Sequence, residues 1–327
     1  MKSRAARRAA WAAGAIVLVA LLVIAARRID AHRVVTELRT VRLVWIAAAL
    51  GSYVAILPLW AMQWRFLAPV AERNTFGRML GVVAMTSSTL NTTAFFVGEA
   101  AGVVLLVARI GLTRSAALSV IAMDQLLVGL AKLTVLATGA LAVTLPVWMH
   151  TGVMALTVGV GALLAGCLLA AWKYESISAR AERRVPTRVA RALERMGVAL
   201  APLRSPHRGG GALTLALAKK VVEALAILCV QRAFGVSLPI ASAVLVLAAL
   251  NLATLLPLVP GNLGVYEGAV VLTYTYLGLP AEQAVSIAVV QHACYFAALA
   301  LPGFAPILLT SLDRRHGDVA RIRRWRV

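Results

Sequence analysis

The chain has 327 residues, of which 61% are hydrophobic and 14% are charged, with a net charge of +20 and a mean hydropathy of +0.85. A soluble domain averages about 25% charged residues, so this much apolar sequence excludes an ordinary soluble protein. The basic residues lie in short segments between apolar runs, as in proteins that cross a membrane several times, and this argues against nucleic-acid binding.

Apolar runs of membrane-spanning length recur along the chain, since a span needs about 20 mainly apolar residues. The first, residues 9–26, also resembles a secretory signal peptide, but two arginines follow it instead of a cleavage site, so we interpret it as a retained helix. The region 79–110 is rich in Ser, Thr and Asn and is a weaker candidate. The other predicted spans are 43–63, 115–145, 150–172, 212–234, 238–258 and 282–309.

Two basic stretches are predicted to lie outside the bilayer. Residues 173–210 hold nine Lys or Arg against three Glu and contain a short amphipathic helix pattern, and residues 311–327 hold six Arg against two Asp. Basic loops mark the cytoplasmic side, so both stretches and the N-terminus are expected there. The sequence therefore divides into a first membrane half (1–172), a basic linker, a second membrane half (211–310) and a basic tail.

The segment VPGNLGVYEGAVV, residues 259–271, interrupts the apolar pattern. Pro260 cannot continue a helix, and Gly261, Asn262 and Gly264 tolerate positive φ, so the chain is expected to break near 258–264 and to restart as a helix near Val265. The 15 residues from Gly264 to Gly278 would give a helix of about 22 Å, against about 30 Å of hydrocarbon. Broken helices at matching places in two halves are typical of a transporter's substrate site.

A matching place exists in the first half. Residues 109–125 align with 276–292 at an offset of 167, which pairs Gly111 with Gly278 and Asp124 with Gln291. Upstream, both halves carry Leu-Asn, then a polar break, then a glutamate. The expected fold is an all-α polytopic membrane protein with about 7–8 transmembrane helices, two of them broken or re-entrant in a pseudo-repeat. The sequence leaves open whether 79–110 and 260–278 cross the bilayer or re-enter.

PGNLGVYE at 260–267 resembles the Pro-Gly-Gly-x-Gly-x-x-Glu signature of the flippase-like integral membrane family, which includes the transmembrane region of lysylphosphatidylglycerol synthases. LNTTAFFVGEAA, at 90–101, looks like the family's first half-site, and the resemblance spans about residues 10–310. This chain departs from the pattern at Asn262, lacks the first proline, and has Gly102 where relatives often carry arginine. The resemblance implies lipid translocation. It does not imply aminoacyl transfer, because the synthases' soluble catalytic domain is not in this sequence.

Charged residues at membrane depth need a partner or a cavity. Glu99 and Glu267 each follow a break, where they either serve function or cap the next helix. Asp124 and Lys132 lie about 12 Å apart along one span, too far for a direct ion pair, so each is a pocket residue or half of an interhelical pair. Cys167, Cys229 and Cys294 lie in apolar runs and indicate buried side chains instead of disulfides or metal ligands.

The span 212–234 begins with a charged cluster. Lys219 and Glu223 are predicted to pair across one helical turn, which leaves Lys220 to attract a phosphate or to snorkel towards the interface. Arg109 and His292 are interpreted as a flanking charge and a structural histidine, and Asn91 matches Asn251 before the two breaks. The candidate substrate-binding residues are Glu99, Asp124, Lys132, Lys219, Lys220, Glu223, Asn251, Tyr266 and Glu267. Pro260, Gly261, Asn262 and Gly264 form the backbone break.

The chain could be an enzyme, a transporter or an accessory membrane protein. An enzyme is disfavoured because the chain has no HExxH, GxSxG or Walker A motif, and neither a metal nor another cofactor is expected. A transporter that moves an anionic or lipid-linked amphiphile across the cytoplasmic membrane explains both breaks and the buried charges together. The alternative is an accessory protein that holds lipid for cell-envelope enzymes without moving it. Membrane lipids and such enzymes are the expected partners.

Overall fold

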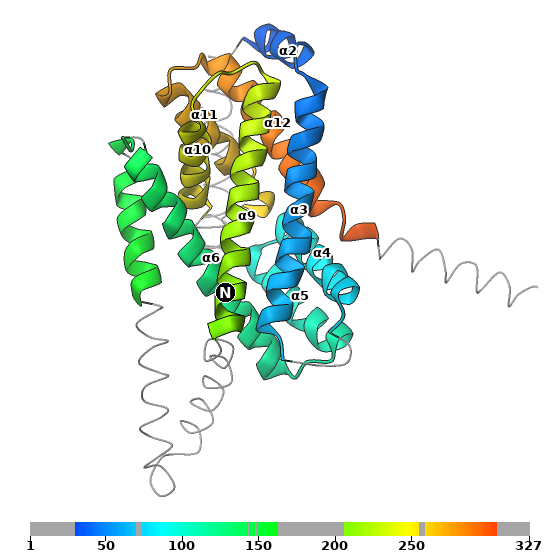
Figure 1. Ribbon diagram of the computed structural model, residues 1–327. Coiled ribbons are helices and arrows are strands. Elements are labelled where there is room, and N and C mark those ends of the chain that lie inside the picture. Colours follow the sequence, from blue (N-terminus) through cyan, green and yellow to red (C-terminus); the bar gives the residue numbers. More distant parts are fainter. Residues whose placement is uncertain are drawn as a thin grey trace, which may run out of the picture.

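The computed structural model describes most of the chain between Asp30 and Ala305 (Figure 1). Every regular element in this part is a helix, which confirms the expected all-α architecture. The expected span 9–26, Cys167, the tail 311–327 and nearly all of the linker lie outside the described residues. The described ranges are 30–69, 74–142, 144–147, 149–162, 206–254 and 259–305.

The long helices fall into two series separated by the linker. Short turns accompany two of them: a π-helical turn, η1 (Leu106–Ile110), ends α5, and a 3-10 turn, η2 (Pro260–Asn262), precedes α11. An apolar helix, Met149–Ala162, follows the first series. The labelled helices are α2 (Ala31–Arg39), α3 (Leu43–Leu67), α4 (Phe76–Thr92), α5 (Phe95–Leu105), α6 (Arg114–Ala142), α9 (Pro206–Ala233), α10 (Ile240–Ala253), α11 (Val265–Tyr276) and α12 (Ala281–Ala300).

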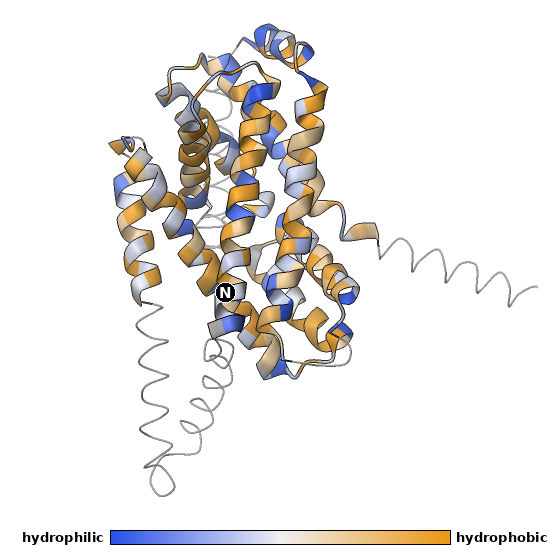
Figure 2. Ribbon diagram, viewed as in Figure 1, coloured by the Kyte–Doolittle hydropathy of each residue, from blue (hydrophilic) through white to orange (hydrophobic). Residues whose placement is uncertain are grey.

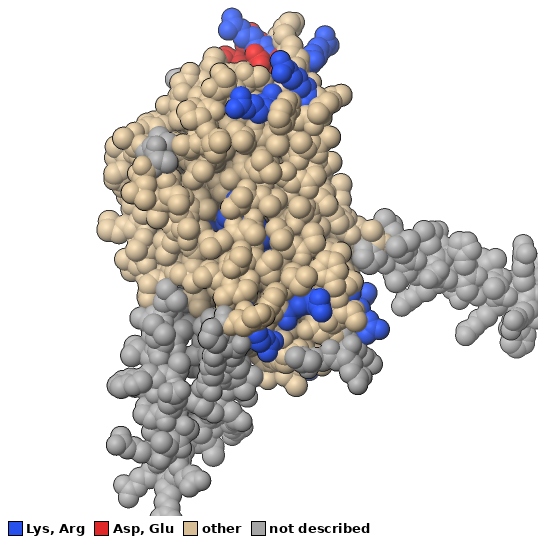
Figure 3. Space-filling view, in the orientation of Figure 1, with Lys and Arg blue, Asp and Glu red and all other residues tan. Residues whose placement is uncertain are grey.

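Three of the described helices, α3, α6 and α12, are long and apolar enough to cross a membrane. Hydrophilic residues gather at the α2 end and at the opposite end, and the surface between them is almost uncharged in this view (Figures 2 and 3). Helix α10 is shorter than the predicted span 238–258, because the helix ends before Thr254. Its 14 residues cover about 21 Å, less than the hydrocarbon thickness. The number of crossings therefore stays a prediction.

Helices α3 and α9 pack along one another in opposite directions. The backbone N–H of Arg42, just before α3, donates to the carbonyl of Ala233 at the end of α9, with an N···O distance of 3.0 Å. At the other end, the Arg208 guanidinium donates to the carbonyls of Phe66 and Ala68. Backbone carbonyls at a helix end lack intrahelical partners, so these contacts satisfy groups that would otherwise be unpaired.

Each series contains two short helices joined at a break. Helix α4 packs against α5, and α10 packs against α11, with the first pair at one end of the molecule and the second at the other (Figure 1). In the second pair the backbone is left-handed at Gly261 (φ 65°) and Asn262 (φ 53°), and α11 begins at Val265 as predicted. In the first pair, extended Thr93 and Ala94 form the break without a glycine.

The two breaks touch each other. A Cβ atom placed on Gly261 would lie 2.9 Å from the backbone oxygen of Asn91, at the end of α4. Glycine is therefore required at this position both by its positive φ and by the close approach of another backbone. Gly303, which follows α12, donates its N–H to Ser88 Oγ on α4 at 2.9 Å. This bond holds the end of α12 against α4.

The two series follow the same order of helices. The offset of 167 residues that aligns the sequences also relates Arg114, the first residue of α6, to Ala281, the first residue of α12. Gly111 and Gly278, one turn earlier, share this offset and are both left-handed, with φ of 82° and 90°. Since α3 and α9 are antiparallel, the corresponding first helices of the two series run in opposite directions.

Buried apolar side chains form two clusters, one for each end of the molecule. The first joins α3, α4, the start of α6 and the start of α9, and the second joins the end of α9 with α10 and α11. Helix α6 passes from the first cluster to the second between Ala131 and Val135. Lys132 lies in this interval. On α9, by contrast, Lys219, Lys220 and Glu223 lie between Ala216 and Ala226, which both belong to the first cluster.

Candidate functional site

A cavity of about 250 Å³ lies beside the first cluster and is lined in part by the two breaks. Its walls come from α3, α6, α9 and α12, and its floor includes Asn91, Gly261 and Asn262. In the space-filling view, blue Lys and Arg atoms are recessed at mid-height, along the course of α9, between the charged ends of this face (Figure 3). The charged residues that line it are Glu99, Asp124, Lys132, Lys219, Lys220 and Glu223.

Asp124 is the centre of a buried polar cluster and is only 2% exposed. Its carboxylate accepts hydrogen bonds from Trp60 Nε1 and Gln63 Nε2 on α3, both at 3.0 Å. The ammonium of Lys219 lies 3.8 Å from the same carboxylate and 5.2 Å from the centre of the Trp60 ring. Both carboxylate oxygens therefore have partners, as a buried charge requires. Asp124 joins α3, α6 and α9.

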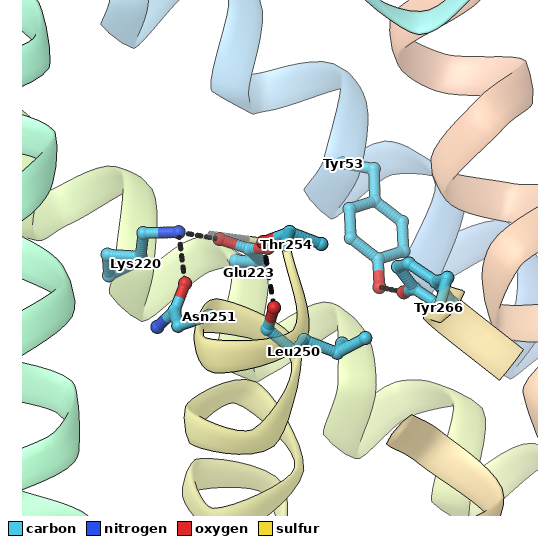
Figure 4. A network of polar contacts seen from close by, with 7 residues as sticks. All are labelled: Tyr53, Lys220, Glu223, Leu250, Asn251, Thr254 and Tyr266. Atoms are coloured by element: carbon cyan, nitrogen blue, oxygen red, sulfur yellow. Dashed lines mark hydrogen bonds and ion pairs between the residues drawn. The ribbon is translucent and has the colours of Figure 1, made fainter. Parts of the chain in front are cut away.

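Lys220 forms a second cluster, shown in Figure 4. Its ammonium lies 2.7 Å from Glu223 Oε2 and 3.0 Å from Asn251 Oδ1 on α10. The predicted pair between Lys219 and Glu223 is therefore wrong, and so is the prediction that Lys220 is free. Helical spacing allows a residue to pair with its third or fourth neighbour. The choice is made by other helices: Asp124 attracts Lys219 to one side of α9, and Asn251 holds Lys220 on another.

Lys132 differs from the other two cavity lysines. It is partly buried and lines the cavity from α6. No ion pair or hydrogen bond to its ammonium occurs among the residues that the structure describes. Lys220 and Glu223 line the same cavity, and Glu223 is already bonded to Lys220. Asp124, two turns away, is turned towards α3 and α9, in agreement with the prediction that the two residues do not pair.

The two glutamates that follow the breaks have similar partners. Glu99 Oε1 accepts from Gln125 Nε2 on α6 at 2.7 Å, and Glu267 Oε1 is 2.8 Å from His292 Nδ1 on α12. Gln125 and His292 are related by the 167-residue offset. Glu267 Oε2 also accepts the backbone N–H of Gly264 at 2.7 Å, so this carboxylate caps α11. Helix capping, one of the two roles expected for Glu267, is therefore confirmed.

Several predicted site residues lie behind the cavity wall. Glu267, Tyr266 and Asn251 are not among the lining residues. Tyr266 stacks on His292 with ring centres 4.3 Å apart, and its hydroxyl accepts from Gln291 Nε2 at 2.9 Å. The Tyr266 and Tyr53 hydroxyls are 3.4 Å apart (Figure 4).

Exposed Arg109 lies in η1, outside the cavity. Cys229 and Cys294 are buried free thiols, as expected. Among the residues that the structure describes, no group of His, Cys, Asp and Glu could hold a metal ion.

The sequence matches the family described as "Lysylphosphatidylglycerol synthase TM region" over residues 11–303. The chain belongs to this family. The match confirms the resemblance inferred from the PGNLGVYE motif and identifies a membrane protein linked to lipid and cell-envelope biosynthesis. The comparison with curated proteins found no match, and neither did the comparison with solved structures.

Gly102, where the resemblance led us to note a departure from the family pattern, lies in a crowded place. A Cβ atom on Gly102 would lie 3.1 Å from Thr86 Cγ2 and 3.2 Å from Ile121 Cδ1. A side chain at this position would therefore require Thr86 and Ile121 to shift by a few tenths of an ångström.

The sequence did not reveal the polar residues that hold the charged ones. Trp60 and Gln63 bind Asp124, and Gln125 binds Glu99. Gln63 is fully buried, although it lies in an apolar span. An uncharged amide within such a span was the available signal, because a buried amide requires a hydrogen-bond partner.

Proposed function

We propose that this protein moves an anionic or lipid-linked amphiphile across the cytoplasmic membrane through the charged cavity. The observation that carries the proposal is the position of six ionisable side chains in one cavity, at mid-height of an otherwise apolar molecule. Charged side chains are costly in hydrocarbon, so a cavity that holds them can also receive a polar headgroup. The acyl chains would remain in the bilayer while the headgroup passes through.

The arrangement of the two helix series supports this proposal. We interpret α3–α6 and α9–α12 as two copies of one unit in inverted orientation, with α4–α5 and α10–α11 as re-entrant hairpins. Their breaks meet at Asn91 and Gly261, on the cavity floor. Inverted repeats with broken helices at the substrate site are a recurrent design of transporters, because the two halves can exchange roles. The cavity would then open to each side in turn.

The proposed orientation follows the distribution of basic residues. The linker 173–210, the tail 311–327 and the N-terminus would lie on the cytoplasmic side, since basic segments stay there. We propose no catalytic step for this chain: the carboxylates of the cavity are held by Gln, Trp and Lys side chains.

Reconstitution in vesicles tests the proposed function. Proteoliposomes with fluorescent phosphatidylglycerol in both leaflets are treated with dithionite, which destroys only the outer label. We expect the protein to expose the inner label, so that fluorescence falls well below the half that remains in vesicles without protein. Glu99→Gln should slow this loss, because it removes a cavity carboxylate while its side-chain oxygen can still accept from Gln125.

The accessory alternative gives a different result. A protein that only holds lipid for other enzymes would retain phosphatidylglycerol through purification, yet leave half of the fluorescence protected. An inactive but well-folded wild-type protein, tested with phosphatidylglycerol and with a polyprenyl phosphate, would refute transport by this chain alone.

A further inference from the structure

The charges of the cavity do not all neutralise one another. Lys219 is 3.8 Å from Asp124, and Lys220 is 2.7 Å from Glu223, so two ammonium groups have a carboxylate partner within the protein. Lys132 has none among the residues that the structure describes. The ammonium that remains without a counter-charge thus comes from α6.

The remaining carboxylate is too distant to serve Lys132. Glu99 is held by Gln125, which precedes Lys132 by seven residues on the same helix, or about 10 Å along its axis. Gln125 directly follows Asp124, so Glu99 is bonded on the Asp124 side of the cavity. Lys132 lines the same cavity about two turns further along α6.

The neighbouring Lys220 has unused hydrogen-bonding capacity. An ammonium group carries three N–H donors, and Lys220 directs its contacts to two acceptors, Glu223 and Asn251. One donor of Lys220 therefore remains free in the cavity that Lys132 also lines. Two ammonium groups with free donors in one cavity suit an anion that presents several oxygens, and lysine is a common phosphate ligand.

We propose that Lys132 is the residue that binds the phosphate group of the cargo, with Lys220 as a secondary contact and Lys219 as a structural residue. This inference rests on the proposed function, because it assigns a ligand to the transport cavity. The cavity opens at mid-height, where the surface between the two charged ends is apolar, so a phosphate that arrives there is carried by an amphiphile (Figure 3). A phosphate lipid is therefore the favoured source, and free phosphate is the other.

Native mass spectrometry of the purified full-length chain tests the assignment. The protein is titrated with phosphatidylglycerol and with monogalactosyl diacylglycerol, which has the same two acyl chains and no phosphate. We expect the wild type to prefer phosphatidylglycerol. Lys132→Met should lower the affinity for phosphatidylglycerol about 10- to 100-fold and leave the galactolipid unaffected, since a hydrogen bond to a charged group is lost.

Two variants serve as controls. Lys132→Arg keeps the charge and should retain the preference for phosphatidylglycerol. Arg39→Gln removes the same charge from the exposed end of α2 and should change neither affinity. Equal binding of phosphatidylglycerol by Lys132→Met and wild type would overturn the assignment. Equal loss of both lipids would overturn it too, because the lysine would then shape the cavity instead of recognising phosphate.

Further measurements separate the ligand source from the transport mechanism. If Lys132→Met does not fold, the wild type still decides, because absence of a preference for phosphatidylglycerol overturns the proposal. Inorganic phosphate that displaces phosphatidylglycerol would identify the phosphate group itself as the ligand, whereas failure to displace it would assign the site to lipid-borne phosphate. Lys132-dependent binding without movement of label in vesicles would refute the proposed function and leave the anion site standing.

Discussion

The contact between the two breaks can be tested with a pair of glycine substitutions. Gly261 has φ of 65°, and a Cβ atom there would lie 2.9 Å from the backbone oxygen of Asn91. Gly235, in the turn after α9, has a similar φ of 69° but has nothing within 4 Å of its Cβ position. Alanine at either position must adopt left-handed backbone, whereas only Gly261→Ala also pushes the two breaks apart.

The expected magnitudes follow from this difference. Left-handed backbone costs an L-residue roughly 1–2 kcal/mol, so both variants should lose about that much stability. Gly261→Ala adds overpacking, which typically costs about 1–3 kcal/mol more. Thermal unfolding in detergent, followed by intrinsic fluorescence, should therefore rank wild type above Gly235→Ala and Gly235→Ala above Gly261→Ala.

Transport should separate the two variants more sharply. Gly261 lines the cavity floor, and Gly235 does not line the cavity. We expect Gly261→Ala to slow the vesicle assay and Gly235→Ala to keep the wild-type rate. Equal stability and equal transport in the two variants would refute the argument that the breaks are in tight backbone contact.

Three further predictions concern stability. Lys219→Met should destabilise the protein by roughly 3–5 kcal/mol, because it leaves the 2%-exposed Asp124 without its cation. Adding Asp124→Asn to the same chain should restore part of the loss in denaturant titrations, and additive losses would contradict the pairing. Gly268→Ala, inside α11 with open space around its Cβ position, should stabilise by about 0.5–1 kcal/mol, and a lower unfolding temperature would count against this helix. Tyr266→Phe should lower the free energy of unfolding by about 1–3 kcal/mol, because Gln291 loses its hydrogen-bond acceptor. Tyr53→Phe removes only a 3.4 Å contact and should cost less stability, and the reverse order in thermal melts would disprove this network.

The sequence predicted the break well because its cause is local. Pro260 and the neighbouring glycines restrict the backbone whatever surrounds them, and α11 begins at Val265 as expected. The position of Glu267 three residues after Gly264 was likewise enough to suggest a cap. Family membership followed from the same motif.

The charge pairs could not be predicted because they depend on neighbouring helices. One turn of α9 offers Glu223 to either lysine, and only the positions of α6 and α10 decide between them. The sequence equally gave no sign that α10 ends at Ala253, since the apolar run continues beyond it. Hydropathy measures how apolar a segment is, whereas helix ends depend on capping and on tertiary contacts.

The antiparallel pair α3–α9 is fastened at both ends, by Arg42 to Ala233 and by Arg208 to Phe66 and Ala68. Asp124 on α6 adds an indirect third link, because it accepts from Trp60 on α3 and pairs with Lys219 on α9. With links along its whole length, this pair is expected to behave as a rigid body during any conformational cycle. Spin labels on α3 and α9 should then keep one fixed separation, while labels on the α4–α5 and α10–α11 hairpins report hinge motion.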